Sequence, residues 1–183
     1  MKILKLAPLF LPPPEYFRLM GEVDIVILDE ELRHDRRMKS MHRTVLSGSA
    51  GASLLTVPVS SPKKGGRSRW SDVRVSPHGR WWHVHQLTMA TLYGPTPFFD
   101  MYKYDFFPLL DSGAVGRSIT DFNIDLILTV RRLTGNVTPL SMGLDPRYER
   151  DSSVEIIDMR FHDFYADSSV RSVIESLFRG ELQ

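Results

Sequence analysis

The N-terminal part of the chain consists of an apolar block, a proline break, a short amphipathic segment and a second apolar block. Residues 3–10 are apolar enough for a buried strand, and prolines at positions 12, 13 and 14 end it, because proline cannot donate to a strand ladder but suits a helix start. Residues 15–20 predict a short helix, and the β-branched run at 23–28 predicts a second strand. This order predicts a parallel βαβ unit.

Shorter apolar stretches follow, up to about residue 76. Residues 44–47 and 53–59 predict two strands around the turn sequence at 48–51, and residues 72–76 predict another. Residues 60–71 predict a mobile loop with Lys63 to Arg67 at its tip. Because that tip lacks the spacing of a phosphate-binding loop and leads into no helix, we interpret it as a solvated loop.

Helical periodicity dominates the second half of the chain. Helices are predicted at 77–93, 96–110 and 118–133, and a final helix follows Asp167 and Ser168. Residues 137–140 predict a strand, and residues 141–153 a connecting loop. The pattern predicts one α/β domain, 1–183: an N-terminal parallel βαβ unit with further strands in residues 1–76, and a mainly helical second half, 77–183, packed on the sheet.

The phase of the helix predicted at 77–93 separates two histidines. At 100° per residue, His85 shares a face with Trp81 and Met89, whereas His83 points about 160° away from His85. This divergence argues against a metal site made by the pair, and no metal site is predicted. His85 is the sharpest catalytic candidate, as a general base or as a donor to a substrate carboxylate or phosphate. The alternative is a partly buried histidine that bonds a backbone carbonyl beside Trp81.

Composition narrows the classes of function. The 183 residues include 23 basic and 22 acidic ones, a net charge of +1, which argues against a dedicated duplex-DNA binder. Cysteine is absent, which excludes disulfides, thiolate metal sites and a cysteine nucleophile. The N-terminal apolar run is too short for a signal-peptide core or a membrane span, so a cytoplasmic protein is expected. No cofactor and no oligomeric state is predicted.

Two charged candidates flank the basic run that follows the second predicted strand. Asp29 ends that strand, and ligands of α/β proteins bind at the carboxyl ends of parallel strands; it is the second catalytic candidate. Arg43 ends the basic run and could clamp an anion such as a nucleotide or sugar phosphate. The alternative is a solvated, self-neutralising charged segment. We expect a cleft where Asp29, Arg43 and His85 converge.

Three further residues are ligand-binding candidates with Arg43. Trp81 and Tyr93 belong to the tryptophan-rich predicted helix. Asn123 projects near the apolar stripe of its own helix, where an amide needs hydrogen-bond partners. A structural bond from Asn123 to a neighbouring loop is the alternative to a ligand contact.

Several motifs occur in an order that points to a family. Trp81, His85, Tyr93 and the run Pro97-Phe98-Phe99 follow the spacing W-x3-H-x7-Y-x3-P-[FY]-F, and residues 55–59 read LTVPV. The N-terminal prolines and aromatics, Asp121-Phe122-Asn123 and the C-terminal stretch 172–178 agree in the same order. This pattern resembles the WbqC-like protein family over nearly the whole chain.

The resemblance implies a role in bacterial surface-polysaccharide biosynthesis. The resemblance names no reaction; our first hypothesis is a transferase of acyl, amino-acyl or nucleotidyl groups in that context, with a nucleotide, nucleotide-sugar or amino acid as ligand. Many relatives open with His-Gln-Pro, where this chain has Leu6, Ala7 and Pro8. If the missing His and Gln belong to a site, the alternative is a non-catalytic binding or scaffold protein.

Overall fold

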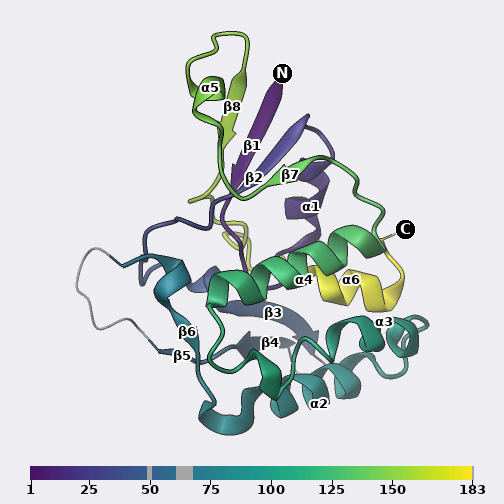
Figure 1. The fold of residues 1–183 in the computed structure, drawn as a ribbon. Helices are drawn as coiled ribbons and strands as arrows, with labels where there is room; N and C mark the ends of the chain where they lie inside the picture. The colour runs from purple at the N-terminus through teal and green to yellow at the C-terminus, as the bar shows by residue number, and fades with distance from the viewer. Residues whose placement is uncertain (49–50, 61–67, 183) are drawn as a thin grey trace.

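A four-stranded parallel sheet forms one end of the molecule (Figure 1). The computed structural model describes residues 1–48, 51–60 and 68–182, so the predicted loop tip at 63–67 lies outside the described residues. The strand order is β7-β2-β1-β8, and Ile3 of β1 pairs with Ile25 on one side and Ile156 on the other. The strands are β1 (Lys2–Leu6), β2 (Ile25–Leu28), β7 (Leu140–Ser141) and β8 (Glu155–Asp158).

The predicted βαβ unit is confirmed. Helix α1 (Pro14–Met20) begins behind Pro13 and ends at Gly21, as the proline break indicated. It joins β1 to β2, which run parallel. The side chains of Ile3, Leu4 and Leu6 in β1 are all buried. Burial on both faces of this inner strand explains why Ile3 and Leu4 stand next to each other as apolar residues, while Lys5 is only half-buried.

Strand β8 was not predicted, although it supplies the second neighbour of β1. It offers only two apolar residues, Ile156 and Ile157, between Glu155 and Asp158. A stretch this short carries too little periodicity to identify a strand without its pairing partner. The sheet therefore takes β7 and β8 from the half of the chain that was predicted to be mainly helical.

Two small antiparallel pairs continue the fold below the sheet. Strand β3 (Arg43–Gly48) pairs with β4 (Gly51–Thr56) in a hairpin that sets Arg43 opposite Thr56, and β5 (Val59–Ser60) pairs with β6 (Arg74–Val75). The predicted strands at 44–47 and 53–59 thus form a hairpin, although 49–50 in its turn lie outside the described residues.

Helices make up most of the second half. They are α2 (Trp81–Tyr93), α3 (Phe99–Phe106), α4 (Ile119–Leu133), α5 (Pro146–Glu149) and α6 (Val173–Arg179). Helix α2 begins at Trp81 rather than at residue 77, because Gly79 and Arg80 adopt left-handed backbone angles with φ of 71° and 45°. The short α5 lies inside the predicted loop 141–153. None of the described helices is long and apolar enough to cross a membrane.

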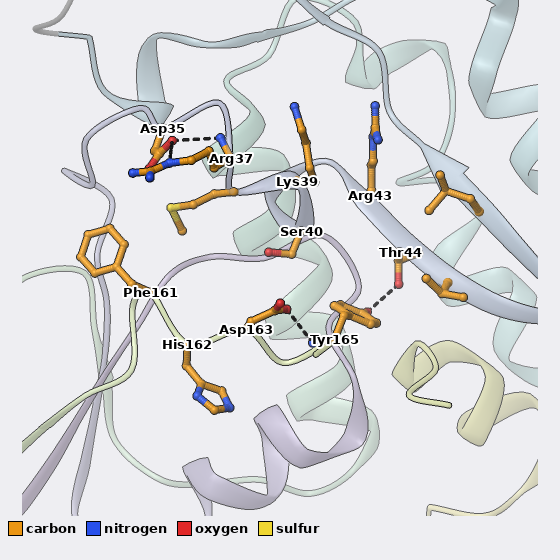
Figure 2. A pocket seen from close by; sticks show the side chains of 13 residues that line it. Asp35, Arg37, Lys39, Ser40, Arg43, Thr44, Phe161, His162, Asp163 and Tyr165 are labelled. Carbon is orange, nitrogen blue, oxygen red and sulfur yellow. Dashed lines mark hydrogen bonds and ion pairs between the residues drawn. The ribbon is translucent and has the colours of Figure 1, made fainter. Parts of the chain in front are cut away.

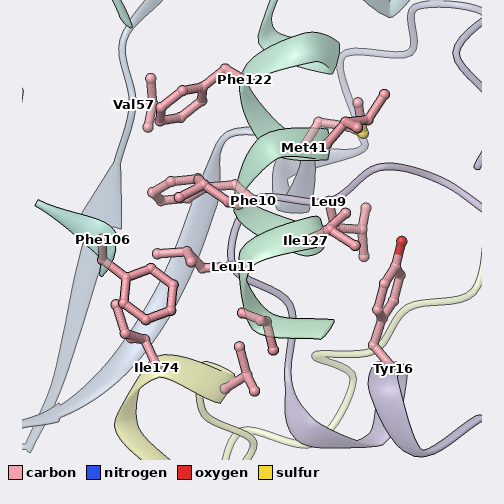
Figure 3. Close-up of a cluster of buried hydrophobic side chains, with 14 of the residues drawn as sticks. Leu9, Phe10, Leu11, Tyr16, Met41, Val57, Phe106, Phe122, Ile127 and Ile174 are labelled. Carbon is pink, nitrogen blue, oxygen red and sulfur yellow. The ribbon is translucent and has the colours of Figure 1, made fainter. Parts of the chain in front are cut away.

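One hydrophobic core connects the sheet half and the helical half (Figure 3). Phe10 and Leu11 come from the loop after β1, Phe122 from α4 and Ile174 from α6, and all four are fully buried. The rings of Phe10 and Phe122 stack with centroids 6.0 Å apart. Helix α4 lies between the parallel sheet and the region of the hairpin and α2, so its buried face contributes to both (Figure 1).

Candidate ligand-binding site

A cavity of about 870 Å³ opens beside the β3–β4 hairpin, and we call it the hairpin cavity (Figure 2). Three parts of the chain form it: the segment before β3, the hairpin itself and the loop after β8. It is lined by Asp35, Arg37, Met38, Lys39, Ser40, Arg43, Thr44, Val45, Leu54, Phe161, His162, Asp163 and Tyr165. Its volume lies in the range of small-molecule sites.

Lys39 and Arg43 give the hairpin cavity its positive charge. Among the described residues neither has a carboxylate partner, and the Nε of Arg43 is buried without a hydrogen-bond acceptor. Figure 2 shows the two side chains extending in the same direction from neighbouring elements. In contrast, Asp35 is neutralised by Arg37 at 2.9 Å, and the hydrogen bond from this guanidinium lowers the pKa of Asp35. Asp163 also lines the cavity, and its Oδ1 accepts a hydrogen bond from the backbone N–H of Tyr165. The lining thus keeps a net positive charge, and Lys39 and Arg43 remain available to an anionic ligand.

The wall below these cations is fixed by the backbone of Leu11. Leu11 has a φ of 43°, a left-handed conformation that is rare for a non-glycine residue. Its carbonyl lies within hydrogen-bond distance of three hydroxyl groups: Thr44 Oγ1 at 2.9 Å, Tyr165 OH at 3.1 Å and Ser172 Oγ at 2.9 Å. Burial raises the pKa of Tyr165 above its usual value. Since Thr44 and Tyr165 are engaged here, they shape the cavity and neither is an activated nucleophile.

His85 and Trp81 lie together in a second cavity of about 530 Å³, on the side of β4 that faces α2. Their rings make an edge contact with centroids 5.1 Å apart. The Nε2 of His85 lies 3.2 Å from the carbonyl oxygen of Thr56 and must donate to it. His85 is only 3% exposed, and burial lowers its pKa to about 4. It is therefore a neutral imidazole that attaches α2 to β4, while His83 is exposed, as the helix phase predicted.

Asp29 lies at the carboxyl end of β2, where its position after the strand predicted it. Its Oδ2 accepts a hydrogen bond from Arg160 at 2.6 Å, and Arg160 also donates to Asp158 at the end of β8. Asp29 lines neither the hairpin cavity nor the second cavity. The negative charge of Asp29 is thus neutralised by Arg160, and this ion pair fixes the loop that follows β8.

Tyr93 and Asn123 are buried and hold parts of the fold together. The hydroxyl of Tyr93 donates to Glu175 at 2.9 Å, which joins α2 to α6. The Nδ2 of Asn123 donates to the carbonyls of Pro8 and Met41, both at 2.8 Å. The structural bond to a neighbouring loop that the sequence predicted as one alternative for Asn123 is present.

The candidate residues are not gathered in one cleft. Arg43 lines the hairpin cavity, His85 and Trp81 line the second cavity, and Asp29, Tyr93 and Asn123 line neither. The expected convergence of Asp29, Arg43 and His85 is not seen, because α2 packs its histidine against the Thr56 carbonyl and Arg160 binds Asp29.

Sequence reasoning missed Phe161 and Tyr165 of the hairpin cavity. Both lie in the loop after β8, and without that strand nothing in the sequence brought the loop near Arg43. The missed signal was the short Ile156-Ile157 pair that forms β8. Among the described residues, no group of three His, Asp or Glu side chains could hold a metal ion.

Comparison with known proteins gives one match. No curated protein and no solved structure matches this chain. The model of the WbqC-like protein family matches residues 7–162, which include the parallel strands except β1, the hairpin, α2 and all of the hairpin cavity up to His162. The chain belongs to the WbqC-like protein family.

Proposed function

We propose that this WbqC-like protein binds a small anionic molecule in the hairpin cavity. The observation that carries the proposal is the pair of cations, Lys39 and Arg43, that line one cavity without a carboxylate partner among the described residues. Charges of one sign that lack internal partners attract a ligand of the opposite sign. The ligand would carry a phosphate or carboxylate, as nucleotides, nucleotide-sugars and amino acids do.

In this proposal the bound molecule is the donor in a transfer reaction of bacterial surface-polysaccharide biosynthesis, carried out in the cytoplasm. Family membership supports the context, and the volume of about 870 Å³ supports a ligand of nucleotide size. The transferred group would be acyl, amino-acyl or nucleotidyl. The cations would hold the anionic part of the donor and stabilise charge that develops on it during transfer.

A non-catalytic binding role is the second candidate. The observation that favours it is the engagement of Thr44 and Tyr165 with the Leu11 carbonyl, which leaves neither hydroxyl as a free nucleophile. His85, the predicted general base, lines a different cavity and has a pKa of about 4. In this role the protein would hold the anionic molecule for a partner enzyme.

Binding is tested by calorimetry with pyrophosphate, a nucleotide-sugar and an amino acid at low and high salt. Lys39→Gln and Arg43→Gln should each weaken phosphate binding about 10-fold to 100-fold, because each removes one charge-assisted contact. Arg150→Gln is the control, since Arg150 is exposed and does not line the cavity. The proposal is refuted if none of the three ligands binds, or if all three variants lose the same amount of affinity.

The transferase and binding roles differ in turnover. Incubation of the wild-type protein with an aminoacyl nucleotide and a polysaccharide acceptor should release the free nucleotide if the aminoacyl group moves to the acceptor, and a nucleoside triphosphate should release pyrophosphate if the nucleotidyl group moves instead. Binding without release, together with transfer restored by a partner enzyme, would favour the non-catalytic role.

A further inference from the structure

We infer that the ligand of the hairpin cavity is a nucleotide and that Phe161 is the surface on which its base stacks. This inference rests on the proposed function, because it takes the cavity as the binding site and names the class of ligand. It adds a second recognition element to the cations: one part of the ligand must be planar and aromatic, another must be anionic.

Phe161 is unusual among the aromatic residues because it is 64% exposed while it lines a cavity. Aromatic side chains stabilise a protein or a complex most when they are buried. A ring that is exposed at the rim of a basic cavity therefore offers its face to a ligand. The guanidinium of Arg160 lies over the ring at 5.8 Å from its centroid. One face of the ring is thus occupied by the protein itself, and a planar ligand can stack on the other.

Arg160 is held in turn by two carboxylates. Its guanidinium donates to Asp29 at 2.6 Å and to Asp158 at 2.9 Å, and the Arg160 side chain is only 24% exposed. These bonds tie the start of the loop after β8 to the carboxyl ends of β2 and β8. The ring of Phe161 is therefore presented from a fixed backbone, which lowers the entropy that ordering it would cost on binding.

The arrangement of the cavity separates the two kinds of contact. Figure 2 shows Phe161 at one side of the opening, and Lys39 and Arg43 at another. A nucleotide carries a planar base at one end and phosphates at the other, so it matches both features at once. Inorganic phosphate or a small amino acid would use the cations and leave the ring unused. Stacking on an aromatic side chain tolerates any base, because every base has a π-face.

The experiment compares ligands that share phosphates and differ in the base. Affinities of UMP, AMP, ribose 5-phosphate and pyrophosphate are measured by calorimetry on the full chain; UMP, AMP and ribose 5-phosphate each carry one phosphate. The variants are Phe161→Leu, which removes the planar ring but keeps an apolar side chain, and Phe161→Trp, which keeps a planar ring. Tyr104→Leu is the matched control, because Tyr104 is 74% exposed and lies under a Lys103 cation, yet does not line the cavity.

We expect UMP and AMP to bind wild-type protein at least about 10-fold more tightly than ribose 5-phosphate. Phe161→Leu should weaken both nucleotides about 10-fold to 100-fold and leave pyrophosphate unchanged, while Phe161→Trp and Tyr104→Leu keep nucleotide affinity. If pyrophosphate and ribose 5-phosphate bind as tightly as the nucleotides, the stacking inference is overturned and the anion site stands. If the affinity for ribose 5-phosphate is weakened by Phe161→Leu as much as the affinity for UMP, the ring contacts the sugar and the inference is likewise wrong. If none of the four ligands binds, the proposed function fails together with it.

Discussion

Replacing Asn123 by alanine should destabilise the protein strongly, although Asn123 lines neither of the two cavities. Asn123 is fully buried on α4, and its Nδ2 donates to the carbonyls of Pro8 and Met41 at 2.8 Å. Pro8 belongs to the loop after β1 and Met41 to the turn before β3, so one amide holds together two segments far apart in the sequence. No other hydrogen bond to either carbonyl is present among the described residues.

The magnitude follows from these two bonds. Each contributes about 0.5–1.5 kcal/mol net, and a buried carbonyl left without a donor costs about 1–3 kcal/mol. The unpaired Oδ1 of Asn123 is removed by the same substitution, which offsets part of the loss. The free energy of unfolding should therefore fall by about 2–4 kcal/mol, which for a chain of this size lowers the melting temperature by roughly 4–16 °C.

Urea denaturation of the wild type and of Asn123→Ala measures this change. Thr129→Ala on the same helix is the control, because the Thr129 hydroxyl bonds only a backbone carbonyl of α4 and its loss should change the free energy of unfolding by less than about 0.5 kcal/mol. A loss below about 1 kcal/mol for Asn123→Ala would contradict the reasoning. It would mean that water or a backbone shift satisfies both carbonyls.

Other substitutions test the remaining buried groups. The pKa of His85 is lowered to about 4 from 6.5, so the unfolded chain binds the proton first and stability falls as the pH drops from 6.5 to 4. This loss in the free energy of unfolding should reach about 3 kcal/mol. In urea denaturation at a series of pH values, the loss should be absent from His85→Gln and present in His83→Gln. Tyr93→Phe removes the bond to Glu175 and should lower the free energy of unfolding by about 1.5–3 kcal/mol, with pyrophosphate affinity unchanged in calorimetry; a large loss of affinity would count against a structural Tyr93. Asp29→Asn leaves Arg160 with Asp158 alone and should cost about 1–2 kcal/mol in chemical denaturation, and an unchanged midpoint would show that this ion pair contributes nothing.

The spacing of residues in the sequence was enough to predict the family and the proximity of two candidate side chains. The motif from Trp81 to Phe99 identified the family that the full comparison also finds. The same motif placed His85 and Trp81 on one helix face, and the structure brings these two together. It did not predict that the imidazole would donate its hydrogen bond to the carbonyl of Thr56, because that contact depends on how α2 packs against β4.

The sequence by itself determined the local elements. Prolines 12 to 14 and the β-branched run before Asp29 fixed the βαβ unit, because strand and helix preferences act between near neighbours in the chain. The 100° phase of α2 likewise separated His83 from His85 without reference to the rest of the molecule.

Only the tertiary structure decided the candidate site. Lys39 and Arg43 meet Phe161 because β8 pairs with β1 and delivers the loop that follows it beside the hairpin. The start of α2 at Trp81 also depends on the left-handed backbone at Gly79 and Arg80. Pairing between distant segments gains its free energy from burial and hydrogen bonds that form only in the folded chain, so no local pattern could encode the cavity.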